Sequence, residues 1–366
     1  MPAGRPASVP DICSAAGGKL KMGISSKTMK FGRLKKGPRN LITDVPGIRV
    51  GHVTLASGAV QTGATVILPC GDSPFRNKLP AAAHVINGFG KSVGLMQVQE
   101  LGTLETPIVL TNTFSVSAGI DAVLDRMLPE HPEIGVSTGT VNPVVMECND
   151  GKLNDIRGRV LRAEDILRAF DSAAAEFAEG AVGGGRGMVC YGLKGGIGSS
   201  SRLIKIDGKT YTVGALLMTN FGKSGNLTVC GRRIADHTPA QPDVGSVIMV
   251  LATDLPLSAR QLGRCARRAQ NGLARTGSYT GNGSGEIALM FSVANRIPHK
   301  CETGVMQGSI LHEDKMDAVF EAVADCVEES VISSLIHAET VTGRDGHTVL
   351  SLRDKTGISE NSDLRD

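Results

Sequence analysis

Residues 244–254 read Val-Gly-Ser-Val-Ile-Met-Val-Leu-Ala-Thr-Asp, and this segment decides the predicted fold. A polar loop with two prolines, residues 236–243, leads directly into it. A continuous apolar run of this length is typical of a strand that is covered on both faces. We therefore predict a central strand of a sheet with other elements packed on each side.

Ser246 follows Gly245 at the start of this strand. Glycine leaves its carbonyl unshielded, so the hydroxyl of the next residue can attack that carbonyl and shift the acyl group from nitrogen to oxygen. Hydrolysis of the ester would free Ser246 as a new N-terminus. Its α-amine, with a pKa of about 7.7–8, could then act as general base for its own hydroxyl. Taken alone, the segment favours a simpler interpretation, in which Gly245 opens a core strand and Ser246 caps it.

A second segment, residues 276–294, places small polar residues around Ser284 and Glu286 before another apolar run. These two residues are two positions apart, so in an extended segment both side chains point to the same side. A hydroxyl and a carboxylate beside a nucleophile can relay a proton or hold an ammonium group. By itself, the segment around Ser284 is also an ordinary glycine loop.

Together with further motifs, the two segments resemble one family over about residues 41–351. The motifs, in chain order, are Ile42-Thr43-Asp44-Val45-Pro46-Gly47-Ile48-Arg49-Val50-Gly51-His52, Asn87-Gly88-Phe89-Gly90-Lys91-Ser92, Leu110-Thr111-Asn112-Thr113, Val182-Gly183-Gly184-Gly185-Arg186-Gly187-Met188, Tyr191-Gly192-Leu193-Lys194-Gly195-Gly196-Ile197-Gly198 and Thr219-Asn220-Phe221-Gly222. The chain resembles the beta-peptidyl aminopeptidases and L-aminopeptidase/D-esterases, which are self-processing N-terminal-nucleophile serine hydrolases.

The resemblance implies a role for each matching position. Ser246 is the expected nucleophile, and the bond between Gly245 and Ser246 is the expected cleavage site. Ser284 and Glu286 match the proton-handling pair of the family, and Asn220 matches the amide of its oxyanion hole. The implied fold is an α/β layered α-β-β-α sandwich of the ornithine acetyltransferase type.

The resemblance also implies the domain organisation. We expect a single catalytic domain over residues 36–353, processed into an alpha chain, 1–245, and a beta chain, 246–366. The expected assembly is a homo-oligomer, a tetramer of such alpha/beta heterodimers.

Glu147 lies at the end of an apolar run, where a carboxylate could bind the free ammonium group of a substrate. The family places an ammonium-binding glutamate in this region, so Glu147 is a candidate substrate-binding residue beside the alternative of an ordinary exposed acid. Some relatives carry a tyrosine two residues further on, where this chain has Asn149. An amide can donate a hydrogen bond but lacks the chemistry of a phenol.

Composition excludes several classes of function. The net charge is +3 over 366 residues, with no Trp and three Tyr, so we expect no nucleic-acid partner. No apolar run reaches the ~18 residues of a membrane span. No apolar signal segment is present near the start. The eight cysteines form no C-x-x-C pair, so we predict free thiols and no metal. Free thiols and the missing signal segment together predict a cytoplasmic location. We expect no cofactor, because the chain itself supplies the nucleophile, the base and the oxyanion donor. We interpret His52 and His84 as structural residues.

Hydrophobic periodicity gives the other elements. We predict helices over residues 163–179, 258–275 and 316–337, strands over 188–193 and 210–219, a mobile N-terminal arm over 1–35 and a C-terminal tail over 354–366. Ser258 is the expected N-cap of the second helix.

Three functions remain open at this stage. The leading hypothesis is a hydrolase that releases N-terminal residues, β-amino or D-residues included, from short peptides, amides and esters with a free N-terminus. The second is an acyltransferase of the ornithine acetyltransferase type, against which a serine nucleophile argues. The third is a non-catalytic scaffold that keeps the fold.

Overall fold

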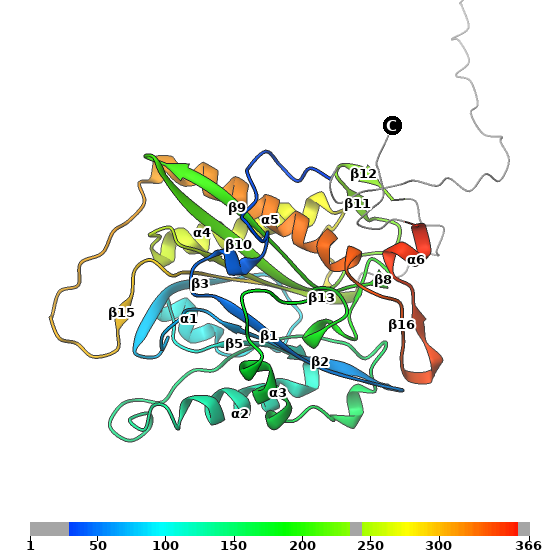
Figure 1. Ribbon diagram of the computed structural model, residues 1–366, viewed down its shortest axis with the longest axis horizontal. Coiled ribbons are helices and arrows are strands. Elements are labelled where there is room, and N and C mark those ends of the chain that lie inside the picture. The colour runs from blue at the N-terminus through cyan, green and yellow to red at the C-terminus, as the bar shows by residue number, and fades with distance from the viewer. Residues whose placement is uncertain (1–28, 235–243, 358–366) are drawn as a thin grey trace, which may run out of the picture.

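The computed structural model describes residues 29–234 and 244–357, and its largest element is a seven-stranded mixed sheet (Figure 1). The strand order is β15-β3-β14-β13-β10-β9, with β4 paired to β3. Its strands are β3 (Asn77–Gly88), β4 (Thr103–Leu104), β9 (Gly196–Ile206), β10 (Lys209–Asn220), β13 (Val244–Thr253), β14 (Gly283–Ser292) and β15 (Ile297–Pro298).

A second sheet of four strands has the order β1-β2-β5-β6. It consists of β1 (Arg49–Ser57), β2 (Val60–Leu68), β5 (Ile108–Asn112) and β6 (Val144–Cys148). Three two-stranded ribbons complete the sheet structure: β7 (Val189–Cys190) with β8 (Leu193–Lys194), β11 (Thr228–Val229) with β12 (Arg232–Arg233), and β16 (Val341–Thr342) with β17 (Thr348–Val349).

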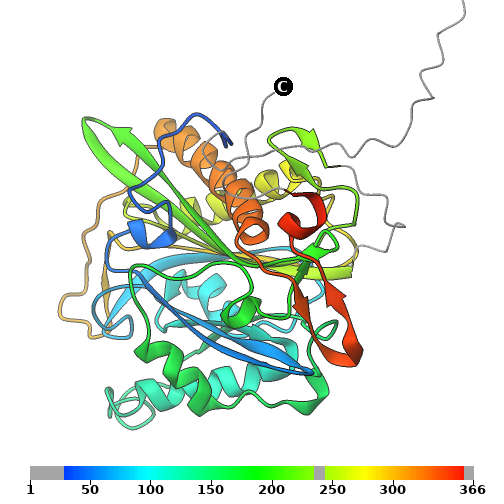
Figure 2. The same cartoon turned by 45° about the vertical axis from the view of Figure 1, so that its right-hand side comes forward.

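Helices cover the outer face of each sheet. In Figures 1 and 2, α4 (Ala259–Arg275) and α5 (Met316–Ile336) lie on the seven-stranded sheet, and α2 (Val116–Met127) and α3 (Ala163–Asp171) lie on the four-stranded sheet. Two shorter helices are α1 (Leu95–Leu101), whose Leu95 and Val98 belong to the core between the sheets, and α6 (Leu352–Thr356), near the C-terminal end of the described residues. The structure therefore confirms an α/β fold in which helices pack on the sheets.

Strand β13 is central, as the sequence predicts. It runs parallel to β14 and antiparallel to β10. Val247 and Met249 belong to the core cluster shared with α4 and α5, whereas Ile248 and Val250 belong to the cluster between the two sheets. Because alternate side chains enter two different cores, the strand needs an apolar residue at nearly every position.

The two longer predicted helices are confirmed. Helix α4 begins after Ser258, whose side chain accepts a hydrogen bond from the Gln261 amide, and α5 ends one residue before the predicted boundary. The prediction over residues 163–179 is wrong at its C-terminal end, because α3 ends at Asp171. Beyond it, Ala174 pairs with Val50 in an isolated β-bridge, so tertiary hydrogen bonds replace those of a further helical turn.

The strand predicted over residues 210–219 is present as β10, and that over 188–193 is present as the short strand β7 and the start of β8. Between β7 and β8, Tyr191 and Gly192 both have positive φ angles and form a tight turn. A turn at this point divides what the sequence predicts as one continuous strand.

The structure describes only part of the predicted N-terminal arm and of the predicted C-terminal tail. Residues 1–28 and 358–366 of the predicted arm and tail lie outside the described residues. The last part of the predicted arm, residues 29–35, packs on the core, with Met29 and Phe31 buried and Lys35 bridged to Leu203 on β9. The start of the predicted tail, residues 354–356, belongs to α6.

Within the described ranges, seven cysteines are free, and Cys13 lies outside those ranges. No helix in residues 29–234 or 244–357 is long and apolar enough to cross a membrane. His52 has a structural role, as predicted. Its Nδ1 lies 2.9 Å from Thr65 Oγ1 and its Nε2 lies 3.0 Å from the Ala178 carbonyl oxygen.

Candidate active site

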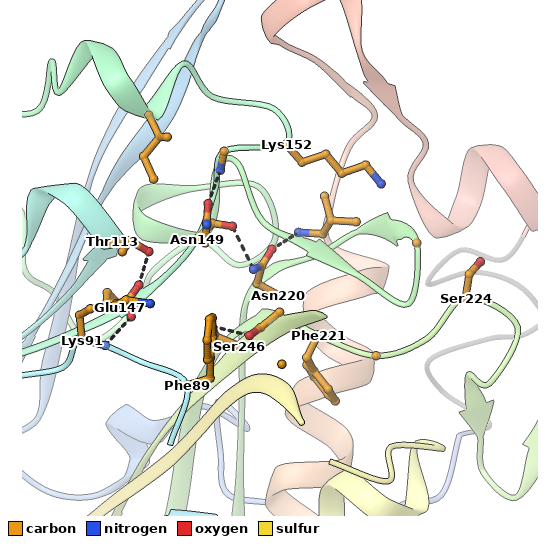
Figure 3. Close-up of a pocket in the computed structure, with 17 residues that line it drawn as sticks. Phe89, Lys91, Thr113, Glu147, Asn149, Lys152, Asn220, Phe221, Ser224 and Ser246 are labelled. Carbon is orange, nitrogen blue, oxygen red and sulfur yellow. Dashed lines mark hydrogen bonds between the residues drawn. The ribbon is translucent and has the colours of Figure 1, made fainter. Parts of the chain in front are cut away.

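A cavity of about 510 Å³ lies where the ends of β6, β10 and β13 meet. Figure 3 shows its lining side chains. Its polar lining residues are Lys91, Thr113, Glu147, Asn149, Lys152, Asn220, Ser224 and Ser246, and its apolar ones include Phe89, Ile156, Val189 and Phe221. The cavity therefore has the mixed lining that is typical of small-molecule sites.

Ser246, which the sequence predicts as the nucleophile, lines this cavity. It is 5% exposed and lies opposite Asn220 in the antiparallel pairing of β13 with β10. Ile248, two residues further along β13, belongs to the core between the sheets, so Ser246 also points to this inner face. Its hydroxyl donates a 2.7 Å hydrogen bond to the carbonyl oxygen of Gly245. The hydroxyl thus lies next to the carbonyl group that self-processing would attack.

Only glycine fits at position 245. A Cβ atom built there would lie 2.1 Å from the carbonyl oxygen of Asn220 and 3.0 Å from the Cα of Phe221. Distances of this kind to backbone atoms cannot be relieved by rotating a side chain. The glycine before Ser246 is therefore required by the close approach of β10 and β13, independently of any role in cleavage.

The side chain of Asn220 is held at both ends. Its Oδ1 accepts a 2.9 Å hydrogen bond from the amide of Val189, and its Nδ2 donates one of 3.0 Å to the carbonyl of Asn149. These two bonds fix the orientation of the amide next to Ser246 (Figure 3). An amide nitrogen has two N–H groups, and one of them makes the bond to Asn149.

Ser284 and Glu286 lie on β14, in parallel register with Gly245 and Val247 of β13. Both side chains are fully buried. They share a face, as the spacing predicts, but it is the face toward α4 and α5, because Ala288 further along β14 belongs to that core. The structure therefore brings the pair beside the nucleophile strand and on the opposite face from the Ser246 hydroxyl.

Glu147 lines the cavity at the end of β6 and is 2% exposed. One carboxylate oxygen accepts a 2.8 Å hydrogen bond from the backbone amide of Lys91, and the other accepts one from the hydroxyl of Thr113. Glu147 is therefore not an ordinary exposed acid. Two donors orient its carboxylate at the wall of the cavity.

Several lining residues carry no prediction from the sequence. Thr113, Lys91 and Phe89 reach the cavity from segments that contribute to the family resemblance, and those motifs were the available signal. Cys148, next to Glu147, also approaches the Ser246 side chain. Burial raises the pKa of the Cys148 thiol well above its ordinary value, so this cysteine stays a neutral thiol and is a poor nucleophile.

The sequence predicts no metal site. The described residues contain no group of three His, Cys, Asp or Glu side chains placed to hold a metal ion. His237 and the loop 236–243 before the expected cleavage site lie outside the described residues.

Comparisons with known proteins place this geometry in a family. Residues 40–349 match the model of peptidase family S58. The chain is 37% identical over 347 residues to the beta-peptidyl aminopeptidase BapA of Sphingosinicella microcystinivorans, covering 87% of this chain and 86% of that protein.

Two solved structures are similar over nearly the whole fold. The PH0078 protein from Pyrococcus horikoshii OT3 is 48% identical, with a TM-score of 0.86, covering 90% of this chain and 95% of that one. The L-aminopeptidase D-Ala-esterase/amidase from Ochrobactrum anthropi, described as a variant among the Ntn hydrolase fold, is 33% identical with a TM-score of 0.83. The match covers 90% of this chain and 94% of that chain.

Proposed function

The chain belongs to peptidase family S58 and is a serine aminopeptidase or amidase, and we propose that Ser246 is its nucleophile. The observation that supports this role is the position of Ser246. Its hydroxyl lies at the cavity, opposite Asn220, and contacts the Gly245 carbonyl. The acyltransferase and scaffold alternatives are not favoured by the relatives.

We propose that the chain first cleaves itself at this bond. Ser246 Oγ attacks the Gly245 carbonyl carbon, the C–N bond breaks as the C–O bond forms, and the hydroxyl proton passes to the departing nitrogen of Ser246. Water then hydrolyses the resulting ester. The products are an alpha chain, 1–245, ending in a carboxylate, and a beta chain, 246–366, that begins with a free amine.

The same hydroxyl then serves the substrate. The amine of Ser246 takes the hydroxyl proton as Oγ attacks the substrate carbonyl, and the second N–H of Asn220 donates to the developing oxyanion. The proton passes to the leaving amine, an acyl-enzyme remains, and water releases the N-terminal residue. No cofactor is needed in this sequence of steps.

Ser284 and Glu286 are the proposed proton-handling pair. Ser284 is level with Gly245 in the register, so it lies beside the peptide bond whose cleavage creates the new amine. From the face opposite the cavity, the pair can act on the amine of Ser246 while the hydroxyl works on the cavity side. A buried carboxylate near this amine would stabilise the ammonium group that forms when the amine takes the hydroxyl proton.

Glu147 is the proposed binding group for the ammonium of the substrate, which makes the enzyme specific for free N-termini. Its oriented carboxylate and small cavity favour short peptides, amides and esters, with β-amino and D-residues as further candidates. We also propose that the layers form an α-β-β-α sandwich with ornithine acetyltransferase-type topology, and that the processed chains assemble as a tetramer of heterodimers.

The test is a matched pair of substrates, an aminoacyl p-nitroanilide with a free amine and its N-acetyl form. Acetylation removes the positive charge, and leaving a buried carboxylate without its partner costs several kcal/mol. We expect the turnover rate of the acetylated substrate to be lower by a factor of about a hundred or more. Comparable rates for the two substrates would show that no ammonium anchor exists and would favour a general amidase.

A further inference from the structure

Lys152 is a cation on the cavity wall that the proposed mechanism does not use. It lines the same cavity as Ser246, and its side chain is exposed. No carboxylate of the described residues pairs with its ammonium group. A lysine that is open to a substrate cavity and has no acidic partner in the described structure is available to bind an anionic group of the substrate.

The backbone that carries Lys152 is held in place. The Gly151 amide donates a 2.9 Å hydrogen bond to Asn149 Oδ1, and the Asn154 amide donates one of 3.0 Å to the Asp150 carbonyl. The next residue, Leu153, is fully buried and its carbonyl accepts a 2.7 Å hydrogen bond from the Arg344 amide. The backbone on both sides of Lys152 is therefore held by hydrogen bonds.

Three polar residues of this wall follow one another in the sequence. Glu147 comes first, then Asn149, whose carbonyl binds Asn220 next to Ser246, and then Lys152. In the view of Figure 3, Glu147 and Lys152 lie on opposite sides of Ser246 and Asn220. The cavity thus has the Glu147 carboxylate on one side of the reacting centre and the Lys152 ammonium on the other.

We propose that Lys152 binds the C-terminal carboxylate of the substrate, so that the preferred substrates are zwitterionic di- and tripeptides. This inference rests on the proposed function, with the ammonium at Glu147 and the scissile carbonyl at Ser246. The remainder of the peptide then extends toward Lys152. Each additional residue adds about 3.3–3.6 Å, so a long peptide would carry its carboxylate beyond the reach of one lysine.

Lys91, the other lysine of the cavity, does not fit this role. Its backbone amide binds Glu147, and its ammonium lies 4.6 Å from the centre of the Phe89 ring. It therefore lies at the Glu147 end of the cavity, where the substrate ammonium, and not the carboxylate, is expected. Lys152 is the cation on the leaving-group side.

The experiment measures kcat/KM for one dipeptide as the free acid and as its C-terminal amide. The variants are Lys152→Met and Lys152→Glu, with Lys205→Met as the matched control, since Lys205 is exposed on β9 and is absent from the cavity lining. We expect the ratio of acid to amide to fall about fivefold in K152M, the upper end for an exposed ion pair, and to fall further in K152E.

The outcomes separate the two proposals. The preference for the acid should weaken as ionic strength rises and should be retained in K205M, and its loss in K152M should appear mainly in KM. If wild-type enzyme hydrolyses both substrates but K152M keeps the wild-type ratio, Lys152 does not bind the carboxylate and the proposed function stands. If wild-type enzyme hydrolyses neither substrate, the proposed function fails and this inference fails with it.

Discussion

The two sheets contribute differently to the cavity. The seven-stranded sheet carries Ser246 and Asn220 on neighbouring strands, with Glu286 on the next strand, so hydrogen-bonded register fixes their spacing. The four-stranded sheet contributes Glu147 at the end of β6, and Thr113 directly follows β5. We infer that the first sheet performs the chemistry and the second binds the charged end of the substrate. Substitutions in the seven-stranded sheet should therefore alter the turnover rate, and substitutions in the four-stranded sheet should alter substrate binding.

The largest effect is expected at the nucleophile. Ser246→Ala removes the hydroxyl that is proposed to attack Gly245, so the chain should remain uncut and inactive, whereas wild-type enzyme should give fragments 1–245 and 246–366. Intact-mass spectrometry with N-terminal sequencing checks the cut, and circular dichroism checks that the variant is folded. A fully active but uncut wild-type enzyme would contradict the mechanism.

The next effect concerns the residues that support Ser246 from the two faces of the same sheet. Asn220→Ala should lower kcat by about 10²–10³, as removal of one oxyanion donor does. If Asn220 only holds the backbone of Val189 and Asn149, the Asn220→Ala variant would instead lose stability, which a urea unfolding curve would show, and would keep its kcat.

Glu286→Gln, matched in size, should slow both self-cleavage and turnover by a smaller factor.

Strand β13 of the seven-stranded sheet and the helix α4 that packs on this sheet were predictable, because their sequence patterns are local. Strand β13 is apolar on both faces, and α4 has a Ser258 cap and an apolar stripe. The end of α3 was not predictable, since residues beyond it are claimed by distant partners: Glu179 accepts hydrogen bonds from the Ser199 amide and the Ser333 hydroxyl. Such tertiary contacts override the helix propensity of an alanine-rich segment.

The candidate site was predictable only in part, for a related reason. Spacing alone places Ser284 and Glu286 on one face, but which face depends on the register of β14 against β13, and a slip of one residue would reverse it. The pairing of Asn220 with Ser246 also arises from register. The donors to Glu147 come from two distant segments, and one of them is a backbone amide that no side-chain motif encodes.

On the second sheet, Glu147→Gln tests the division of roles. Glutamine keeps the size of the side chain and an acceptor for the Lys91 amide, but it removes the negative charge. We expect kcat/KM for substrates with a free amine to fall about a hundredfold, while self-cleavage proceeds as in wild type. The measurement pairs steady-state kinetics with the mass spectrum of the same preparation. A variant that fails to cleave itself would mean that Glu147 belongs to the chemical machinery and that the two sheets are not separate in function.

The smallest effect on activity is expected at His52 on β1, which is absent from the cavity lining, and there the expected change concerns stability alone. Burial lowers the pKa of His52 to about 4 from an ordinary value of 6.5. Between these values the unfolded chain binds more protons than the folded one, so the stability that depends on neutral His52 is complete above about pH 6.5 and is lost as the pH falls toward 4. The full difference amounts to about 3 kcal/mol.

The test is urea unfolding at several pH values, in the uncut Ser246→Ala background so that one chain unfolds. As the pH falls, the free energy of unfolding should decline less steeply for His52→Gln than for the parent. His347→Gln, at an exposed position, is the control and should follow the parent. Equal slopes for parent and His52→Gln would show that His52 is not held neutral by the fold, and an altered kcat for His52→Gln in the Ser246 enzyme would show that the four-stranded sheet influences the chemical step.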